Sequence, residues 1–305
     1  MRINMKLLAL FIILPVIVFG QAKVGTAIGQ FLEIPASARG EGMASAVLAT
    51  VDDISSIYYN PGGLAWQNGR QFVISHTMLY AGISHDFGAY TMPAFGGIVG
   101  VSAISLYTGD IDETTPYQPE GTGKTYVAGD LSAGLSYSRL LTDRFSVGVN
   151  VKYVGEYLAD VHTQGWAMDI GTIFKTAFKD IRLGMALTNF GPDLKFIQQS
   201  APLPMAFHFG AAGEILNTPT NRITLDIEGS HPNDNLEKFQ IGAEYAYKEM
   251  LFLRGGAKIQ YDTDLFALGG GFKFPISSFM MRADYSFTYM RYLKSVHRFS
   301  LGVEF

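Results

Sequence analysis

From residue 71 to the C-terminus, apolar and polar residues alternate along one segment after another. Residues 145–153 read F-S-V-G-V-N-V-K-Y, and residues 281–289 read M-R-A-D-Y-S-F-T-Y. A period of two places the apolar side chains on one face of a β-strand. The pattern predicts fourteen strands of about ten residues each, near 71–80, 83–93, 96–107, 126–140, 144–157, 165–176, 181–190, 204–214, 221–231, 237–247, 250–260, 265–274, 279–290 and 295–305.

The number of strands decides between a membrane barrel and a soluble sandwich, since both have one apolar face. Fourteen strands closed into a barrel enclose a lumen too wide for side chains to fill, so the apolar face must point outward into lipid. Aromatic residues near the strand ends suit the girdles of such a barrel, namely Tyr157, Trp166, Tyr245, Tyr247, Tyr289 and Tyr292. We therefore predict an all-β membrane protein, a 14-stranded antiparallel outer-membrane β-barrel over residues 71–305.

The lengths of the connections support this strand count. With both barrel ends in the periplasm, connections after odd strands face outside and are long, and those after even strands are short turns. The long connections follow odd strands, namely 108–125, 158–164, 191–203 and 232–236. The short turns follow even strands, namely 142–143, 248–249 and 275–278, although 215–220 is slightly long for its side.

Residues 43–66 lack the period of two. Ile54, Ile57 and Tyr58 fall on one face of a short helix, which Asp52 is placed to cap and Pro61 to end. Two interpretations remain open: a small helical cap packed by its own apolar side, and a small N-terminal helical plug, or hatch, formed by residues 21–66 in the barrel lumen.

A set of polar and turn-forming residues makes up the candidate plug motif. Asn60 to Gly63 read N-P-G-G, a tight turn in which the glycines permit a positive φ. Arg39 is expected to pair with Asp52 or Asp53, or with carboxylates of the barrel wall. The motif comprises Arg39, Asp52, Asp53, Asn60, Pro61, Gly62 and Gly63, and the wall carboxylates include Asp169 and Glu244.

Residues 1–20 read as a secretory signal peptide. Arg2 and Lys6 precede an uncharged apolar run from Leu7 to Phe19, which small residues follow. A membrane anchor would need about twenty apolar residues. Cleavage after Gly20 is preferred, with Ala22 as the alternative.

Composition narrows the function classes. Charged residues make up 16% of the chain, below the roughly 25% of an ordinary soluble domain. Without residues 1–20 the chain keeps 21 basic and 27 acidic residues and no basic patch, so a nucleic-acid partner is not expected. The absence of Cys excludes a disulfide framework and any thiolate metal site.

The last strand ends the chain on an aromatic residue. Residues 297–305 read H-R-F-S-L-G-V-E-F, in strict alternation up to Phe305. This resembles the terminal strand signal by which outer-membrane barrels are recognised for insertion. We therefore interpret Phe305 as a C-terminal insertion signal and predict a location in the outer membrane.

Residues 30–66 resemble the N-terminus of a known family. Residues 30–43 read Q-F-L-E-I-P-A-S-A-R-G-E-G-M, and A-T-V-D-D at 49–53 and Y-N-P-G-G-L-A at 59–65 follow. These runs are similar to the PorV/PorQ family, which belongs with the FadL-like outer-membrane barrels; Gly62 stands where the family more often has Ala. The resemblance implies fourteen strands around an N-terminal hatch and a role linked to type IX secretion in Bacteroidetes-like bacteria.

Motifs for catalysis are weak. Residues 121–125, G-T-G-K-T, resemble a phosphate loop, but Gln118 occupies the position of its first glycine and no helix is expected to follow. The six His show no ligand spacing, and no Gly-x-Ser-x-Gly elbow occurs. Asp52 and Asp53 could bind a cation, but helix capping explains them more simply. We expect no enzyme activity, cofactor or metal site.

Two functions from different classes remain open. The first is a barrel of the type IX secretion apparatus, whose outer loops bind exported cargo, the translocon or an attachment-complex subunit. The second is a FadL-like transporter that passes a hydrophobic small molecule or lipid across the outer membrane. The candidate partner residues lie in connection 108–125, which is acidic (Asp110, Asp112, Glu113, Glu120), and in connection 191–203, which is more apolar (Leu194, Phe196).

Overall fold

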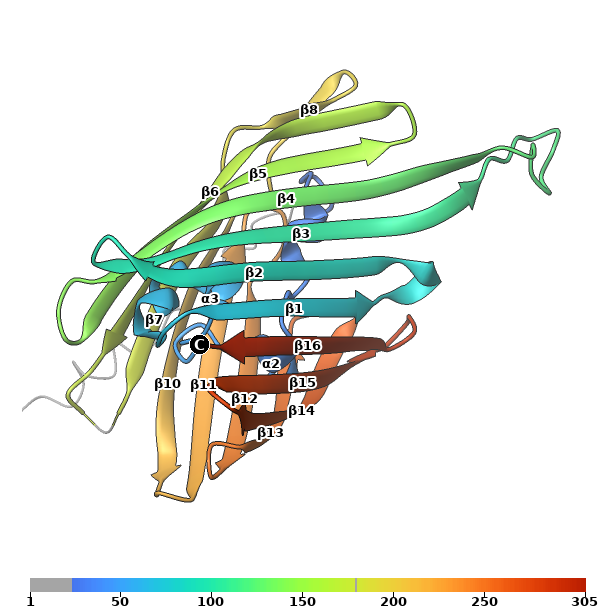
Figure 1. Cartoon of the computed structure of the whole chain (residues 1–305). Coiled ribbons are helices and arrows are strands. Elements are labelled where there is room, and N and C mark those ends of the chain that lie inside the picture. The colour runs from blue at the N-terminus through green and yellow to red at the C-terminus, as the bar shows by residue number, and fades with distance from the viewer. Residues whose placement is uncertain (1–23, 179) are drawn as a thin grey trace, which may run out of the picture.

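The computed structural model of the chain describes residues 24–178 and 180–305, and the predicted signal peptide lies outside these residues (Figure 1). Fourteen of the described strands close into one antiparallel barrel, in which β1 pairs with β16 and β7 pairs with β10. The barrel strands are β1 (Gln71–Met78), β2 (Ser84–Ala94), β3 (Gly97–Asp112), β4 (Thr125–Leu140), β5 (Phe145–Leu158), β6 (Val161–Lys175), β7 (Arg182–Phe190), β10 (Ala206–Asn217), β11 (Asn221–Pro232), β12 (Lys238–Tyr247), β13 (Leu251–Ile259), β14 (Asp264–Ile276), β15 (Phe279–Met290) and β16 (Val296–Glu304).

The two faces of the wall have the chemistry that the alternation predicts. On β5, the outward Val151 is 48% exposed whereas the neighbouring inward Asn150 is 3% exposed. The large exposed side chains of the strands are mostly apolar, and the buried polar side chains point into the lumen. Five of the six predicted girdle aromatics are exposed, namely Tyr157, Trp166, Tyr247, Tyr289 and Tyr292. The prediction of a closed fourteen-stranded antiparallel barrel is therefore confirmed.

The connections differ from the sequence prediction in several places. The connection predicted at 108–125 shortens to 113–124, because β3 continues to Asp112. The long connection predicted at 158–164 is wrong, because β5 continues to Leu158 and β6 already begins at Val161. Ala159, with a φ of 52°, lies in the short turn between them. The connection predicted at 191–203 spans residues 191–205 and contains the short hairpin β8 (Leu194–Phe196) and β9 (Gln199–Ala201). A 3₁₀ helix, η4 (Tyr80–Gly82), lies in the connection between β1 and β2.

The two mouths of the barrel differ. We call the end that holds the C-terminus and the short turns the inner mouth, and the opposite end the outer mouth. The hairpin of β3 and β4 projects beyond its neighbours at the outer mouth (Figure 1). In outer-membrane barrels the short turns lie on the periplasmic side, and on that pattern we expect the outer mouth to face the cell exterior.

Residues 28–67 lie inside the barrel, and we call them the luminal segment. It contains η2 (Gln30–Glu33), α2 (Ala38–Gly42), α3 (Ser56–Tyr59) and η3 (Pro61–Trp66). Helix α2 contacts β13 to β16, while η3 contacts β3 to β6 across the lumen. The segment therefore touches opposite walls of the barrel. Within residues 24–178 and 180–305, no helix combines the length and apolar character needed to cross a membrane.

Helical structure in the luminal segment is shorter than predicted. Ala44 and Ser45 adopt φ angles of 55° and 64°, which a right-handed helix does not contain, so residues 43–55 are mostly turns. Helix α3 begins at Ser56, and Asp52 is therefore not its cap. Instead, the Asp53 carboxylate accepts a hydrogen bond of 3.0 Å from the Ser55 backbone N–H.

Candidate functional site

One side of the luminal segment is held by backbone contacts and glycines. The Asn60 side-chain amide donates hydrogen bonds to the carbonyls of Leu48 (2.9 Å) and Thr172 (3.1 Å), which ties the segment to β6. A Cβ atom on Gly171 would lie 2.1 Å from the Asn60 Oδ1 atom, and a Cβ atom on Gly148 would lie 2.2 Å from the Pro61 carbonyl oxygen. Only glycine allows the wall to come this close.

The glycines of the N-P-G-G motif act differently from the prediction. Neither Gly62 nor Gly63 has a positive φ, and Pro61 starts η3 rather than a tight turn. A Cβ atom on Gly62 would lie 2.7 Å from the Gly171 carbonyl oxygen, and one on Gly63 would lie 2.3 Å from the Val51 carbonyl oxygen. Close packing, not backbone conformation, therefore requires glycine at both positions.

The opposite side of the segment is held by charge. Arg39 lies 2.6 Å from Asp53 and 3.1 Å from Asp52, and Arg282 of β15 lies 3.0 Å from Asp53. Burial alone would raise the pKa of the Asp53 carboxyl, but the two guanidinium groups outweigh it and hold that pKa below its usual range. Of the two wall carboxylates considered for Arg39, Glu244 lies 3.9 Å from it.

The other wall carboxylate belongs to a separate pair. Asp169 is 2.8 Å from the Lys152 ammonium group, within the wall formed by β5 and β6. Arg254 extends the network around Arg39 along the wall. Its guanidinium group lies 2.7 Å from the Glu244 carboxylate and 2.7 Å from the Asp284 carboxylate. Charged wall residues thus gather on the β12 to β15 side of the lumen.

A second buried ion pair was not predicted from the sequence. Glu41 of α2 accepts hydrogen bonds from the Lys258 ammonium group (2.8 Å) and the Thr288 hydroxyl (2.9 Å), and both members of the ion pair are buried. Burial alone would raise the pKa of the Glu41 carboxyl, but Lys258 and Arg298 outweigh it and lower that pKa. The only hint in the sequence is an acidic residue between two glycines, Gly40 and Gly42.

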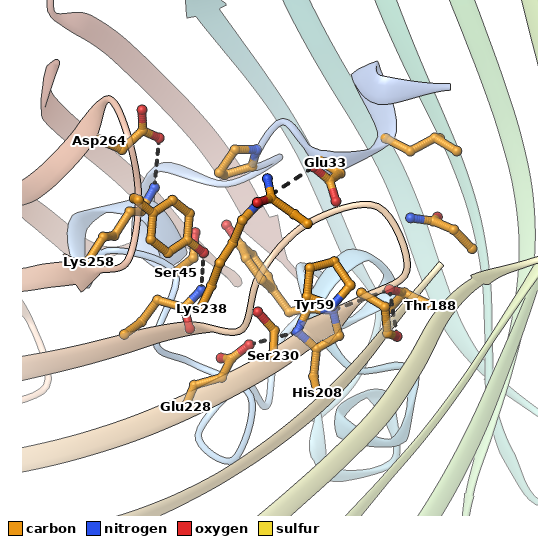
Figure 2. Close-up of a pocket in the computed structure, with 18 of the residues that line it drawn as sticks. Glu33, Ser45, Tyr59, Thr188, His208, Glu228, Ser230, Lys238, Lys258 and Asp264 are labelled. Carbon is orange, nitrogen blue, oxygen red and sulfur yellow. Dashed lines mark hydrogen bonds and ion pairs between the residues drawn. The ribbon is translucent and has the colours of Figure 1, made fainter. Parts of the chain in front are cut away.

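A cavity of about 320 Å³ lies between the luminal segment and the wall near the outer mouth, and we call it the outer cavity. Figure 2 shows Glu33 and Tyr59 of the segment facing the same space as Lys238 and Lys258 of the wall. His208 lies 3.1 Å from Glu228 and 3.2 Å from the Thr188 hydroxyl on this wall. Polar side chains therefore line much of the outer cavity.

Burial shifts the pKa of several ionisable groups that line the outer cavity. Burial raises the pKa of the Glu33 carboxyl, and the Lys238 ammonium group 4.0 Å away only partly offsets this effect. Burial also raises the pKa of the Tyr59 and Tyr261 hydroxyls, so both remain hydrogen-bond donors. The outer cavity can accordingly donate and accept hydrogen bonds. In the part of the chain that the structure describes, no cluster of three His, Asp or Glu side chains could hold a metal ion.

A separate cavity of about 280 Å³ lies at the inner mouth, and we call it the inner cavity. Its lining includes Arg39, Asp53 and Trp66 from the luminal segment and Arg182 and Arg222 from the wall. Residues of the luminal segment thus line both cavities.

The predicted partner residues divide into accessible and inaccessible ones. Asp110 and Asp112 lie in the outer end of β3, and Glu113 and Glu120 follow in the exposed tip of the β3–β4 hairpin. Leu194 is 3% exposed and faces inward.

Part of connection 191–205 packs against the luminal segment, whereas most residues of its β8–β9 hairpin are exposed. The Ile28 N–H donates a 2.9 Å hydrogen bond to the Pro202 carbonyl, and the Leu203 side chain lies against Gly29. The interpretation of Leu194 as a partner contact is therefore wrong, because its side chain is buried in the core that includes Ala167 and Leu203. Phe196 is half-buried, and Ile197 is the exposed apolar residue of this connection.

The last residue lies at the inner mouth. Phe305 is 54% exposed and packs edge to face on Phe279 at a ring distance of 5.1 Å. Backbone hydrogen bonds of 2.9 and 3.4 Å join it to Arg70, where the barrel begins. Its role in insertion stays a prediction.

A closed barrel with an apolar outer face, a polar lumen and an N-terminal segment inside defines an outer-membrane β-barrel protein. Residues 19–232 match the family of the type IX secretion system protein PorV. The chain therefore belongs to this family, as the resemblance implied, and its location is the outer membrane. The family and the fold are those of a membrane barrel and not of an enzyme.

Solved structures share the fold at low sequence identity. The chain is similar to the Ralstonia pickettii toluene transporter TbuX, with a TM-score of 0.61, 13% identity and coverage of 89% of this chain and 98% of that one. For the CymD monoaromatic hydrocarbon channel, the TM-score is 0.59 at 12% identity, with 88% and 96% covered. A Pseudomonas aeruginosa FadL homologue gives 0.56 at 11% identity, with 88% and 97% covered. A search of curated proteins gives no match.

Proposed function

We propose that this chain is a barrel of the type IX secretion apparatus that binds exported polypeptides or partner subunits at its outer mouth. We propose further that the luminal segment is a plug that closes the lumen. The binding role is inferred from the polar lining of the outer cavity. The contacts of the luminal segment with opposite walls support its role as a plug.

The outer cavity suits a polar ligand. Pockets for hydrophobic molecules are lined predominantly by apolar side chains with few polar groups. Here Glu33, Lys238 and Lys258 surround the space, together with the pair of His208 and Glu228. A hydrophobic molecule would displace water from these charged groups without offering them hydrogen bonds, which costs free energy, whereas a polypeptide offers carbonyls, amides and charges.

The projecting hairpin of β3 and β4 provides a second polar surface at the outer mouth. Its tip carries Glu113 and Glu120, and Tyr117 is 95% exposed. Tyrosine is enriched at protein interfaces because it offers both an apolar ring and a hydroxyl group. The hairpin therefore fits a protein partner better than a bilayer or a hydrocarbon.

The test compares secretion by cells that carry the wild-type chain and a cavity variant. Replacing Lys238 with Glu should strand type IX cargo in the periplasm, because the outer cavity then carries a repulsive negative charge beside Glu33. Lys294→Glu, in the exposed connection between β15 and β16, is the matched control and should secrete normally. Normal secretion by the Lys238 variant, with the barrel assembled, would contradict the binding role of the outer cavity.

The second candidate function is transport of a hydrophobic small molecule. The solved structures with similar folds include a toluene transporter and a monoaromatic hydrocarbon channel, and this similarity supports the candidate. Unchanged secretion in a strain that lacks the chain, together with impaired uptake of long-chain fatty acids or other hydrophobes, would favour transport over secretion.

A further inference from the structure

The outward, membrane-facing wall of the barrel carries an ionisable pair. The His76 Nδ1 atom of β1 lies 2.6 Å from the Asp86 Oδ1 atom of β2, and the side chains are 51% and 52% exposed. The next outward residues on β1 are Ile74 and Met78, both exposed and apolar. An ionisable residue on a lipid-facing surface carries a free-energy cost, which makes this pair a candidate functional site.

A groove on the outer surface of the wall begins at this pair and continues toward the inner mouth, and we call it the wall groove. Its volume is about 410 Å³, in the range of roughly 300–1,000 Å³ that small-molecule sites occupy. The strand register explains the hollow, because Gly88 lies between Ile74 and Ala103 on neighbouring strands. A Cβ atom at Gly88 would meet nothing nearer than the Val73 carbonyl oxygen at 4.0 Å.

The wall groove has a polar end and an apolar end. Asp86 pairs in register with His76 and Ser105, and this row lies nearer the outer mouth. The neighbouring row of lipid-facing residues, one step closer to the inner mouth, contains Leu301, Ile74, Gly88 and Ala103. Hydrogen-bonding groups are thus placed toward the cell exterior, and an apolar trough continues toward the membrane interior.

The polar end lies near the level of an outer-mouth aromatic residue. Tyr107 is 45% exposed and pairs with Ser84. This pair is the next lipid-facing row beyond Asp86 and Ser105 in the direction of the outer mouth. Aromatic residues of this kind mark the membrane interface in outer-membrane barrels. The head-group region of the outer leaflet is therefore within reach of Asp86 and His76.

We propose that the wall groove binds one acyl chain of an outer-leaflet lipid, and that Asp86 and His76 hydrogen-bond a hydroxyl or amide group where that chain joins its head group. The polarity of the groove matches that of such a lipid, with its head toward the exterior and its chain toward the membrane interior. The trough is bounded on one side by Phe299 and Leu301, which also suits a single chain. The site is independent of the outer cavity, so it stands whether or not the secretion proposal holds.

The test uses photocrosslinking in vesicles that contain the full barrel. Lipid A with a diazirine on one acyl chain is compared with phosphatidylcholine that carries the same diazirine, because phosphatidylcholine has no hydroxyl or amide donor. We expect crosslinks concentrated in β1 to β3, and more of them with the lipid A probe. Uniform labelling around the wall would overturn the proposal, as would a protein crosslinked at the groove in intact outer membranes.

Two variants and a matched control separate the acyl site from the polar site. Gly88→Leu should fill the trough and reduce labelling of β1 to β3 by about tenfold, the change that 1.4 kcal/mol produces. Asp86→Leu should reduce labelling by lipid A and leave that by phosphatidylcholine unchanged. Gly270→Leu is the control, because Gly270 also faces outward and a Cβ atom there lies 3.8 Å from the nearest atom. Heat-modifiable gel migration reports folding, and equal labelling of Gly88→Leu and wild type would overturn the proposal.

Discussion

On the β4 to β6 side of the lumen, the luminal segment lies against glycines and backbone carbonyls, whereas on the β13 to β16 side buried ion pairs add to close contacts with wall glycines. Gly148 and Gly171 represent the first side, and the pair of Glu41 and Lys258 represents the second. The first side depends on shape, since any side chain would overlap the segment. The second depends on charge as well, since Gly256 and Gly269 also lie close to the segment but the ion pairs require ionised partners.

The two sides also differ in what holds them together. Close packing is insensitive to salt and pH but tolerates almost no added volume. Buried ion pairs tolerate replacement as a pair, but removing one partner leaves an uncompensated buried charge. The ion pairs should therefore respond to pH and to loss of one partner, and the glycine contacts to added volume.

Removing both sides at once should have the largest effect. Deletion of residues 31–65 takes away every contact of both kinds, and we expect the barrel to fold but to leak small solutes. Permeability of vesicles to sugars of graded size measures this. Deletion of residues 113–124, the tip of the β3–β4 hairpin, is the control and should not leak. If the first deletion leaves permeability unchanged, the luminal segment is not the lumen barrier.

Breaking the charged side alone should have the next largest effect. Lys258→Met leaves Glu41 buried without its cation and should lower the free energy of unfolding by about 3–5 kcal/mol. Adding Glu41→Gln to this variant should recover part of the loss, because the Glu41 carboxylate is then no longer buried without the Lys258 cation. Urea titration of the barrel in detergent measures each variant.

A surface carboxylate provides the control for the charged side. Glu249 is 60% exposed and pairs with Arg222 at 2.7 Å. Glu249→Gln should change the free energy of unfolding by less than about 1 kcal/mol. A loss in Lys258→Met no larger than in this control would show that the ion pair to Glu41 does not anchor the segment.

Overfilling the glycine side should cost somewhat less. Gly148→Val would push a side chain into the Pro61 carbonyl and should destabilise the barrel by about 1–3 kcal/mol. Gly255→Val is the matched control, because Gly255 faces outward and a Cβ atom there would lie 3.5 Å from a flexible Leu268 side chain. Protease cleavage within residues 31–65 should increase only for Gly148→Val, and equal cleavage of both variants would contradict the role of close packing.

The barrel could be predicted from the sequence because a period of two is a local property. Each strand shows its own alternation, and the strand count then follows from simple addition. The Val161 start of β6 was missed because residues 158–164 are polar enough to resemble a loop, although the inward Thr163 continues the alternation.

The contacts of the luminal segment could be predicted only in part. The pairing of Arg39 with Asp52 or Asp53 joins residues close in sequence, so charge and spacing suggested it. Glu41 and Lys258 are 217 positions apart, and nothing local connects them. The closed barrel brings them together, because a lumen-facing position on β13 lies beside α2 only after all the strands have paired.

The smallest predicted effect is a dependence on pH that only the charged side should show. The pKa of the Glu41 carboxyl lies below its usual value of 4.5 in the folded chain. Its contribution to stability is therefore complete above about pH 4.5 and is lost as the pH falls through the lower folded pKa. The destabilisation caused by Glu41→Gln should stay constant from pH 7 to about pH 5 and then shrink, whereas that of Gly148→Val should not change. Urea titrations of the three proteins across this pH range measure both differences. Parallel curves for the two variants would mean that the two sides do not differ in their dependence on charge.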